Sequence, residues 1–495
     1  MRKLLTFFML AGCVLPMEAQ RTLSLDSCRA LALRNNKQLN VTRFKQEAAK
    51  NIRKAAKTKY LPKVDALGTY QYYSKEISLL DNDSKDALNH FGTNVSTAAG
   101  NNLTNLIGGL AQQGIISPAM ARQMGGLISQ IGGPIAQAGD QLGQNITDGL
   151  RTNTHNIFAG AIMLRQPVFM GGAIIAANKI AAINEQLSDN SSDLVRQATL
   201  YSIDQTYWLV VSLREKEKLA VSYHKLVSKL SEDVKKMIKE GVATRADGLK
   251  VDVKVNEAEM QITQIENGLS LSKMLLCQLC GLPLDEQITL ADENKEILTV
   301  LSTDDSVQSN AATENRPELR MLQNAVDISK EATKIIRAAY LPQVLLTGGY
   351  IVSNPNVLNG FERKFSGLWN VGVMVRVPVW NWFEGSYKVR ASKLATSMAE
   401  MEFNDAKEKI DLQVAQSQFK VKEAHKRLIM ANKNIKSAEE NLRCANLGFR
   451  EGVMQTTDVM AAQTAWQMAQ SQKIDAEADY KLALVNLEKS LGTLN

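Results

Sequence analysis

Two stretches of the chain carry apolar residues at mixed spacings of three and four, the period of an α-helix with one buried stripe. They span residues 173–239 and 386–450, and they contain no proline and almost no glycine. At about 1.5 Å per residue, each helix would extend about 100 Å. Helices of this length cannot be buried in a compact core, so we expect them to pack lengthwise on other helices, as in coiled coils.

Each long helix ends at the same short sequence. Gly241 and Gly452 are typical C-terminal stops, each is followed by a valine, and new helices are predicted over about 246–280 and 456–491. The sequence therefore predicts two helical hairpins whose tips point in one direction.

The return helices begin with residues that suit helix caps. Thr244 and Asp247 have the spacing of a capping box, in which the carboxylate accepts from backbone N–H groups that the helix leaves unpaired. The second return helix begins with Gln455-Thr-Thr-Asp458.

Other segments alternate with period two. A helix predicted over residues 25–58 is broken by Tyr60-Leu-Pro62, and alternation follows from Val64 to Tyr72. Residues 158–165 and 369–379 alternate in the same way, so we expect strands with one apolar and one polar face. An apolar side of about 10 residues is long enough for a tilted strand to cross a bilayer. A two-layer sheet in a soluble protein would use similar alternation.

The chain contains two copies of this arrangement. Residues 31–64 match residues 311–344 at an offset of 280, and the later half of each copy matches at an offset of 211, which pairs Gly281 with Gly492. The difference of 69 places an insertion in the first copy, at about 74–155. A duplicated topological unit of this kind indicates a repeat architecture.

The insertion joins two strands and contains three Gly-Gly pairs among apolar runs. A mobile loop would explain the glycine and asparagine content. Short helices that cap or constrict a pore would explain the apolar runs, and we prefer this second interpretation.

The start of the chain predicts where the protein is transported. Arg2 and Lys3 precede an apolar run over residues 4–14, which predicts a signal peptide over residues 1–19 and an exported protein. A lipid anchor on Cys13 is the less favoured alternative.

The net charge of +7 over 495 residues is spread along helix faces, so we do not expect nucleic-acid binding.

Four cysteines follow the predicted signal peptide. Cys28 could form a disulfide with Cys277 or Cys280 in an oxidising compartment. For the Cys-x-x-Cys spacing of Cys277 and Cys280, small buried residues in a helical seam are favoured over a metal or redox site. The four histidines show no metal-ligand spacing and no glycine loop suits a phosphate, so we predict neither a cofactor nor an enzyme.

Four strands from one chain cannot close a barrel, and an open sheet edge in lipid leaves backbone groups unpaired. If the strands cross a membrane, the chain must therefore assemble from several copies.

The chain resembles the TolC family of outer membrane efflux proteins over essentially its whole mature length. The resemblance rests on Asn315-Arg-Pro-Glu-Leu319, on Tyr340-Leu-Pro342, on the strand exits Pro167-Val-Phe169 and Pro378-Val-Trp380, and on both Gly-to-Asp tips. It implies an α+β membrane fold: a homotrimer with a 12-stranded β-barrel in outer membrane lipid and an α-helical tunnel through the periplasm. The domains would be a first repeat over 20–281, an equatorial linker over 282–312 and a second repeat over 313–495.

The resemblance also implies site residues. The tips would bind the hairpins of a periplasmic adaptor protein, which couples the duct to an inner-membrane pump of the RND or ABC type. These tip residues are Gly241, Val242, Ala243, Gly452, Val453 and Met454. Asp458 occupies the position of an acidic ring at the periplasmic constriction, although helix capping alone is an equal alternative. Ala461 and Met454 depart from the family pattern, which predicts a less acidic gate with a different latch.

Two functions remain open on the sequence. The first is a passive outer membrane exit duct of a tripartite efflux or type I secretion system, which exports small molecules such as drugs and toxic compounds. The sequence does not separate small-molecule efflux from polypeptide secretion. The second is a trimeric structural or adhesive envelope protein without transport. Two matched tips favour the duct.

Overall fold

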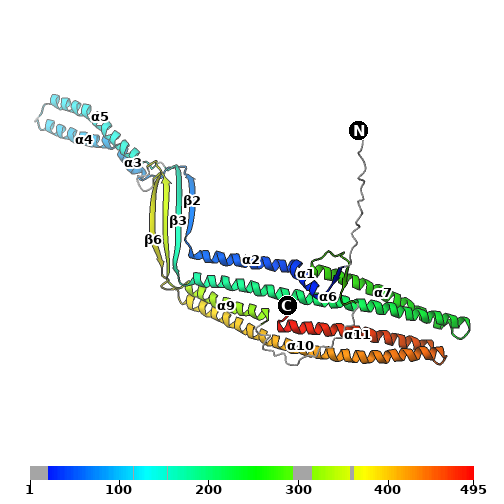
Figure 1. Cartoon of the computed structure of the whole chain (residues 1–495). Coiled ribbons are helices and arrows are strands. Elements are labelled where there is room, and N and C mark those ends of the chain that lie inside the picture. The colour runs from blue at the N-terminus through cyan, green and yellow to red at the C-terminus, as the bar shows by residue number, and fades with distance from the viewer. Residues whose placement is uncertain (1–20, 115, 153, 294–314, 357–361, 495) are drawn as a thin grey trace, which may run out of the picture. The chain divides into compact units, whose positions relative to one another are not determined.

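The computed structural model describes residues 21–114, 116–152, 154–293, 315–356 and 362–494 (Figure 1). The chain forms two compact units. One comprises residues 1–57, 173–337 and 381–495 and is mainly helical, and the other comprises residues 58–172 and 338–380 and contains the larger sheet. The predicted signal peptide and Cys13 lie outside the described residues.

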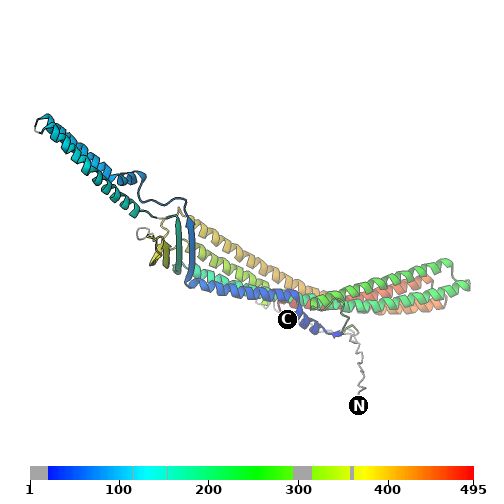
Figure 2. The same ribbon diagram turned by 90° about the horizontal axis from the view of Figure 1, so that it is seen from above.

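The helical unit is built from two long hairpins. In the first, α6 (Ala173–Lys239) returns as α7 (Arg245–Cys280), and in the second, α10 (Glu384–Arg450) returns as α11 (Thr456–Leu491). Helix α11 also packs against α6, so the hairpins lie side by side (Figures 1 and 2). The predicted lengthwise packing of the long helices is confirmed.

The helix predicted over residues 25–58 is two helices, α1 (Leu25–Asn35) and α2 (Lys37–Lys57), followed by a short 3-10 turn over Thr58–Tyr60. Asn36 causes the break because its Oδ1 accepts from Gln38 N at 2.9 Å and starts α2. Helix α2 packs along α6. In the second half, α9 (Pro317–Ala338) lies beside α10, as the hydrogen bond between the hydroxyls of Ser329 and Thr396 shows.

Residues that the internal repeat makes equivalent form equivalent contacts. Gly281 ends α7 with φ +70°, and a Cβ on it would lie 2.9 Å from Asn35 O. Gly492 ends α11 with φ +72°, and a Cβ on it would lie 3.0 Å from Asn315 O. Only glycine meets both the left-handed backbone and the close approach at these two positions.

In the largest apolar core, the first described residues of the chain pack against the first hairpin. Strand β1 (Arg21–Leu23) pairs in parallel with β4 (Ile288–Leu290), and both pack on α1, α6 and α7. Arg29 donates through Nε to the fully buried Asp204 at 2.8 Å, and this partner raises the pKa of Arg29.

Cys28, Cys277 and Cys280 lie in this core as buried thiols. Cys280 Sγ contacts Cys28 O at 3.6 Å. The structure therefore agrees with the interpretation of small buried residues in a helical seam and contains no disulfide among these three residues.

The second unit contains a four-stranded antiparallel sheet in the order β2-β3-β5-β6. The strands are β2 (Lys63–Tyr72), β3 (Asn156–Met170), β5 (Gln343–Asn354) and β6 (Ser366–Arg376). The expectation that the last strand runs to residue 379 is wrong, because β6 ends before Pro378, which has no N–H for the ladder.

The insertion is helical. It forms α3 (Asn82–Asn89), α4 (Phe91–Gln112) and α5 (Pro118–Gly149), of which α4 and α5 pack as an antiparallel hairpin. Helices were expected here, but α4 and α5 are long, with 22 and 32 residues. No helix among the described residues has both the length and the apolar character needed to cross a membrane.

Candidate functional site: matched hairpin tips and a two-faced sheet

The two hairpin tips have the same backbone geometry. Gly241 and Gly452 adopt φ +77° and +73°. In the first tip, Val242 N donates to Met237 O at 2.9 Å, and in the second, Val453 N donates to Gly448 O at 2.9 Å. These bonds are those of a Schellman turn, which satisfies the last carbonyls of a helix. The duplication therefore extends to individual hydrogen bonds at the tips.

The tips present apolar side chains to solvent. Val242 is 69% exposed and Val453 is 79% exposed. Met454 is less exposed, and its side chain lies over Gly448, where an added Cβ would be 3.0 Å from Met454 Cγ. Ala243 is half-buried and packs against the core above the tips. Each tip thus has a protruding valine beside a residue that packs inward.

Both return helices are capped by an aspartate. Asp247 Oδ2 accepts from Thr244 Oγ1 at 2.6 Å, and Thr244 Oγ1 accepts from Asp247 N at 3.2 Å. The hydroxyl of Thr244 is the main cause of a lowered pKa of Asp247. In the second tip, Asp458 Oδ2 accepts from Gln455 N at 3.0 Å, and the Asp458 side chain remains exposed.

An apolar cluster directly above the tips joins the two hairpins. Val459, the residue after Asp458, is fully buried among side chains of the first hairpin, which include Val234 and Val251. Phe449 and Met460 of the second hairpin pack on the same cluster. The position of Asp458 is therefore fixed by the packing of its neighbour.

Further along, the contact between α11 and the first hairpin is partly polar. Gln467 Nε2 donates to Gln261 Oε1 at 2.7 Å, and Lys216 pairs with Asp475 at 2.6 Å. The buried Gln463 donates weakly to Leu226 O at 3.5 Å. Apolar contacts accompany these polar ones, since Leu226 of the first hairpin packs on a cluster of Leu442, Ala445 and Ala462 in the second.

The strand register gathers apolar side chains on one face of the sheet. Ile162 of β3 lies opposite Ala66 and Tyr350, and Tyr350 lies opposite Trp369. The face continues through Val64, Tyr70, Phe158, Leu164, Leu346, Val371, Val373 and Val375. Tyr70 and Phe158 stack with ring centroids 4.8 Å apart.

The other face of the sheet is mixed. It carries an ion pair between Arg165 and Asp65, together with Thr347, Asn370 and Arg376. The register also places apolar side chains on this face, namely Leu67, Met163, Ile351, Leu368 and Met374. A sheet with one continuous apolar face and one face that carries charged and polar groups suits a wall between lipid and water. Its edge strands, β2 and β6, have no further strand beside them among the described residues.

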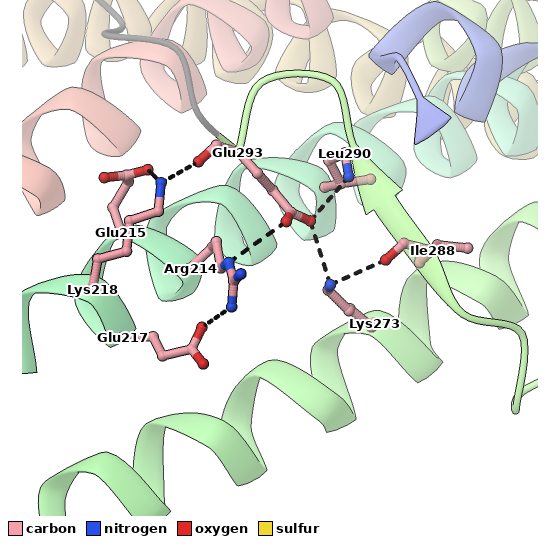
Figure 3. Close-up of polar contacts among 8 residues, drawn as sticks. All are labelled: Arg214, Glu215, Glu217, Lys218, Lys273, Ile288, Leu290 and Glu293. Carbon is pink, nitrogen blue, oxygen red and sulfur yellow. Dashed lines mark hydrogen bonds and ion pairs between the residues drawn. The ribbon is translucent and has the colours of Figure 1, made fainter. Parts of the chain in front are cut away.

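A buried ion-pair cluster that the sequence did not reveal attaches β4 to the first hairpin (Figure 3). Glu293 is 3% exposed, and its carboxylate lies 3.4 Å from Lys273 Nζ and 3.8 Å from Arg214 Nε. It also accepts from Leu290 N at 2.9 Å, while Lys218 Nζ donates to Glu293 O at 2.8 Å. The cluster anchors the strand immediately before the undescribed residues 294–314, which include part of the predicted linker.

No three His, Cys, Asp or Glu side chains are grouped as a metal site requires in the part of the chain that the structure describes.

Long paired hairpins joined to four two-faced strands define the protomer of a channel. A family model for outer membrane efflux proteins matches residues 309–493. The alkaline protease secretion protein AprF of Pseudomonas aeruginosa is 22% identical over 345 residues, which cover 69% of this chain and 71% of AprF. The outer membrane protein TolC of Vibrio cholerae is 20% identical over 320 residues, which cover 62% of this chain and 70% of TolC.

The solved structure of the Campylobacter jejuni CmeC outer membrane channel has the same fold, with a TM-score of 0.70 at 14% identity over 95% of this chain and 86% of CmeC. The chain therefore matches the family model of outer membrane efflux proteins over residues 309–493 and shares the fold of such channels over most of its length. It is an outer membrane efflux channel that extends into the periplasm, and the predicted fold class is confirmed. Because this is a channel family, the prediction that the chain is not an enzyme is also confirmed.

Proposed function

We propose that the chain forms a homotrimeric passive duct that receives its cargo from a periplasmic adaptor and an inner-membrane pump. The observation that carries the proposal is the pair of tips with matching hydrogen bonds and protruding valines. An exposed apolar side chain on a rigid turn suits burial in a protein interface. Three copies would provide six such tips around one axis, a surface suited to repeated contacts with adaptor hairpins.

The adaptor-binding residues in this proposal are the six tip positions named from the sequence. Replacement of Val242 or Val453 by Asp would place a charge in the interface, and we expect the adaptor to be lost from affinity-purified complexes. Lys420→Asp, at an exposed position on α10 far from the tip, is the matched control. Equal retention of the adaptor by all variants would contradict the assignment.

Asp458 combines two roles in this proposal. Its Oδ2 caps α11, and the exposed carboxylate also lines the periplasmic constriction. Asp247 holds the equivalent cap in the first hairpin and is assigned the cap alone.

The experiment that tests the duct is planar-bilayer conductance of the purified protein, with Asp458→Ala and Asp247→Ala compared during a titration with divalent cations. We expect a small, cation-preferring conductance that divalent cations block, and we expect Asp458→Ala alone to relieve the block. Equal behaviour of the two variants would reduce Asp458 to a cap. A folded trimer without conductance would contradict the proposal that the chain forms a duct.

The cargo class in this proposal is small molecules, with a pump of the RND or ABC type. The names of the relatives AprF and PrtF, which are protease secretion proteins, support exported polypeptides as a second candidate. Deletion of the chain from its host separates the two, because loss of efflux raises drug susceptibility while loss of secretion removes proteins from the culture medium.

Export by the segment over residues 1–19 is also part of the proposal. N-terminal sequencing of the mature protein should give a start near Gln20. A lipid-modified N-terminus at Cys13 would show the alternative route to the outer membrane.

A further inference from the structure

The α4–α5 hairpin of the insertion is nearly uncharged. Between Phe91 and Thr147 the only charged residues are Arg122 and Asp140, and Phe91 is the only aromatic residue. Asp140 is occupied within the hairpin, since its Oδ1 accepts from Thr93 N at 2.9 Å. The hairpin therefore has few groups that would favour a fully hydrated surface.

Small residues hold α4 and α5 together. A Cβ on Gly92 would clash with Ala136 O, a Cβ on Gly139 would clash with Gly92 Cα, and a Cβ on Gly132 would lie 3.1 Å from Ser96 Oγ. The two backbones approach closely along this line, so the larger apolar side chains of both helices cannot point into it.

The larger side chains form a separate stripe on α5. Its exposed members are Met120, Met124, Leu127, Ile131, Ile135, Leu142 and Ile146. Positions 120, 131 and 142 follow at intervals of 11 residues, as do positions 124, 135 and 146. An 11-residue period keeps an apolar stripe on one side of a helix and is typical of helices that associate along their length. The stripe extends about 39 Å at about 1.5 Å per residue.

Helix α4 continues the same apolar surface. Val95 and Leu103 line a groove of about 520 Å³ together with Ile128, Ile131 and Ile135 of α5. Gln137 and Gln141 lie outside the stripe and are exposed. The hairpin is thus amphipathic as a unit, with one face built from side chains of both helices.

We propose that this apolar face packs against the same face of the hairpins in two further copies of the chain, which forms a six-helix bundle. The inference rests on the proposed homotrimer and deepens it. The argument for a second copy is continuity with the trimer interface. The hairpin follows β2, an edge strand of the sheet that must pair with a neighbouring copy in lipid, and it is connected to that strand through residues 73–90.

A lipid surface is a poorer match for the face. Helices that lie in a membrane interface carry many Lys and Arg residues on the polar side and Trp or Phe on the apolar side. Here Arg122 is the only basic residue between Phe91 and Thr147, and the polar positions are mainly Gln, Asn, Ser and Thr. Three uncharged hairpins can approach one another without repulsion.

The test is cysteine cross-linking of the full-length protein after replacement of the exposed Cys444 by Ser. Leu127→Cys and Ile131→Cys place a thiol on the stripe, and Gln137→Cys places one outside it. Each variant is treated with a flexible bismaleimide and separated by denaturing electrophoresis, and its oligomeric state is measured independently by light scattering.

We expect a trimer in all variants and a shift from monomer to dimer and trimer bands for the two stripe variants only. A trimer in which the stripe variants cross-link no better than Gln137→Cys would overturn the bundle and leave the duct intact. A monomer would overturn both. In proteoliposomes, quenching of a fluorophore on Ile131→Cys by brominated lipid would assign the face to the membrane and also overturn the bundle.

Discussion

Replacement of a glycine by alanine can destabilise a protein in two ways, through backbone strain and through a clash of the added Cβ. Four glycines that end helices in this protein allow the two effects to be measured separately. Gly241, Gly281, Gly452 and Gly492 all have a φ between +70° and +77°. A Cβ on Gly241 or Gly452 would meet nothing within 4 Å, whereas a Cβ on Gly281 or Gly492 would lie about 3 Å or less from backbone atoms of Asn35 or Asn315. Alanine at the tips therefore adds only backbone strain, and alanine at the helix ends adds strain and a clash.

The expected magnitudes follow from this difference. The left-handed conformation costs alanine about 1–2 kcal/mol. Displacement of a packed backbone adds about 1–3 kcal/mol, so Gly281→Ala and Gly492→Ala should destabilise by about 2–5 kcal/mol. The clash cannot be relieved by a rotamer change, because the nearest atoms include the backbone carbonyls of Asn35 and Asn315.

The assay is thermal unfolding of the four alanine variants in detergent, followed by the helical circular dichroism signal. We expect the midpoints of Gly281→Ala and Gly492→Ala to fall clearly below those of the tip variants. Four equal midpoints would refute the role of the Asn35 and Asn315 contacts. A difference between Gly281→Ala and Gly492→Ala would show that the equivalent contacts are not energetically equivalent.

Three further predictions concern the helical unit. Because the folded pKa of Asp247 is lowered, its contribution to stability is present above the unfolded pKa and is lost as the pH falls through the folded pKa; Thr244→Ala should reduce this acid dependence of unfolding. Glu293→Gln leaves Lys273 without its buried carboxylate and should cost about 1–3 kcal/mol in thermal unfolding. Val459→Ala removes fully buried methyl groups between the hairpins and should cost about 2 kcal/mol in the same assay.

Matched controls accompany these variants. Glu215→Gln, in the more exposed ion pair with Lys218, should change stability by less than about 1 kcal/mol. Val453→Ala, at the exposed tip, should have no measurable effect on unfolding. Equal losses for Glu215 and Glu293, or for Val453 and Val459, would show that burial does not decide these costs. If the pH dependence of unfolding were unchanged in Thr244→Ala, the Thr244 hydroxyl would not be its cause.

Local periodicity was enough to predict the hairpin helices and the strands of the larger sheet, but not the short strands β1 and β4. Spacings of three and four determined the hairpin helices, and period two determined the two-faced strands, because each pattern depends only on residues close in sequence. The glycine and valine of each tip were also visible, since a helix stop followed by a cap is a local signal. The break at Asn36 was not predicted, although its cause is also local. The Asn36 side chain accepts from the backbone N–H of Gln38, and the periodicity around it continues without interruption.

Only the tertiary structure decided which residues meet. The register that places Ile162 beside Tyr350 depends on pairing between distant strands, and the contact of Gly281 with Asn35 depends on how two helices cross. The carboxylate of Glu293 lies about 20 residues from Lys273 in sequence and about 80 from Arg214, so no spacing rule could join them. In the insertion, Gly132 belongs to one of the Gly-Gly pairs that suggested a loop, yet it lies with Gly92 and Gly139 where α4 and α5 approach. A missing Cβ permits both flexibility and close packing, and only the neighbouring helix selects between them.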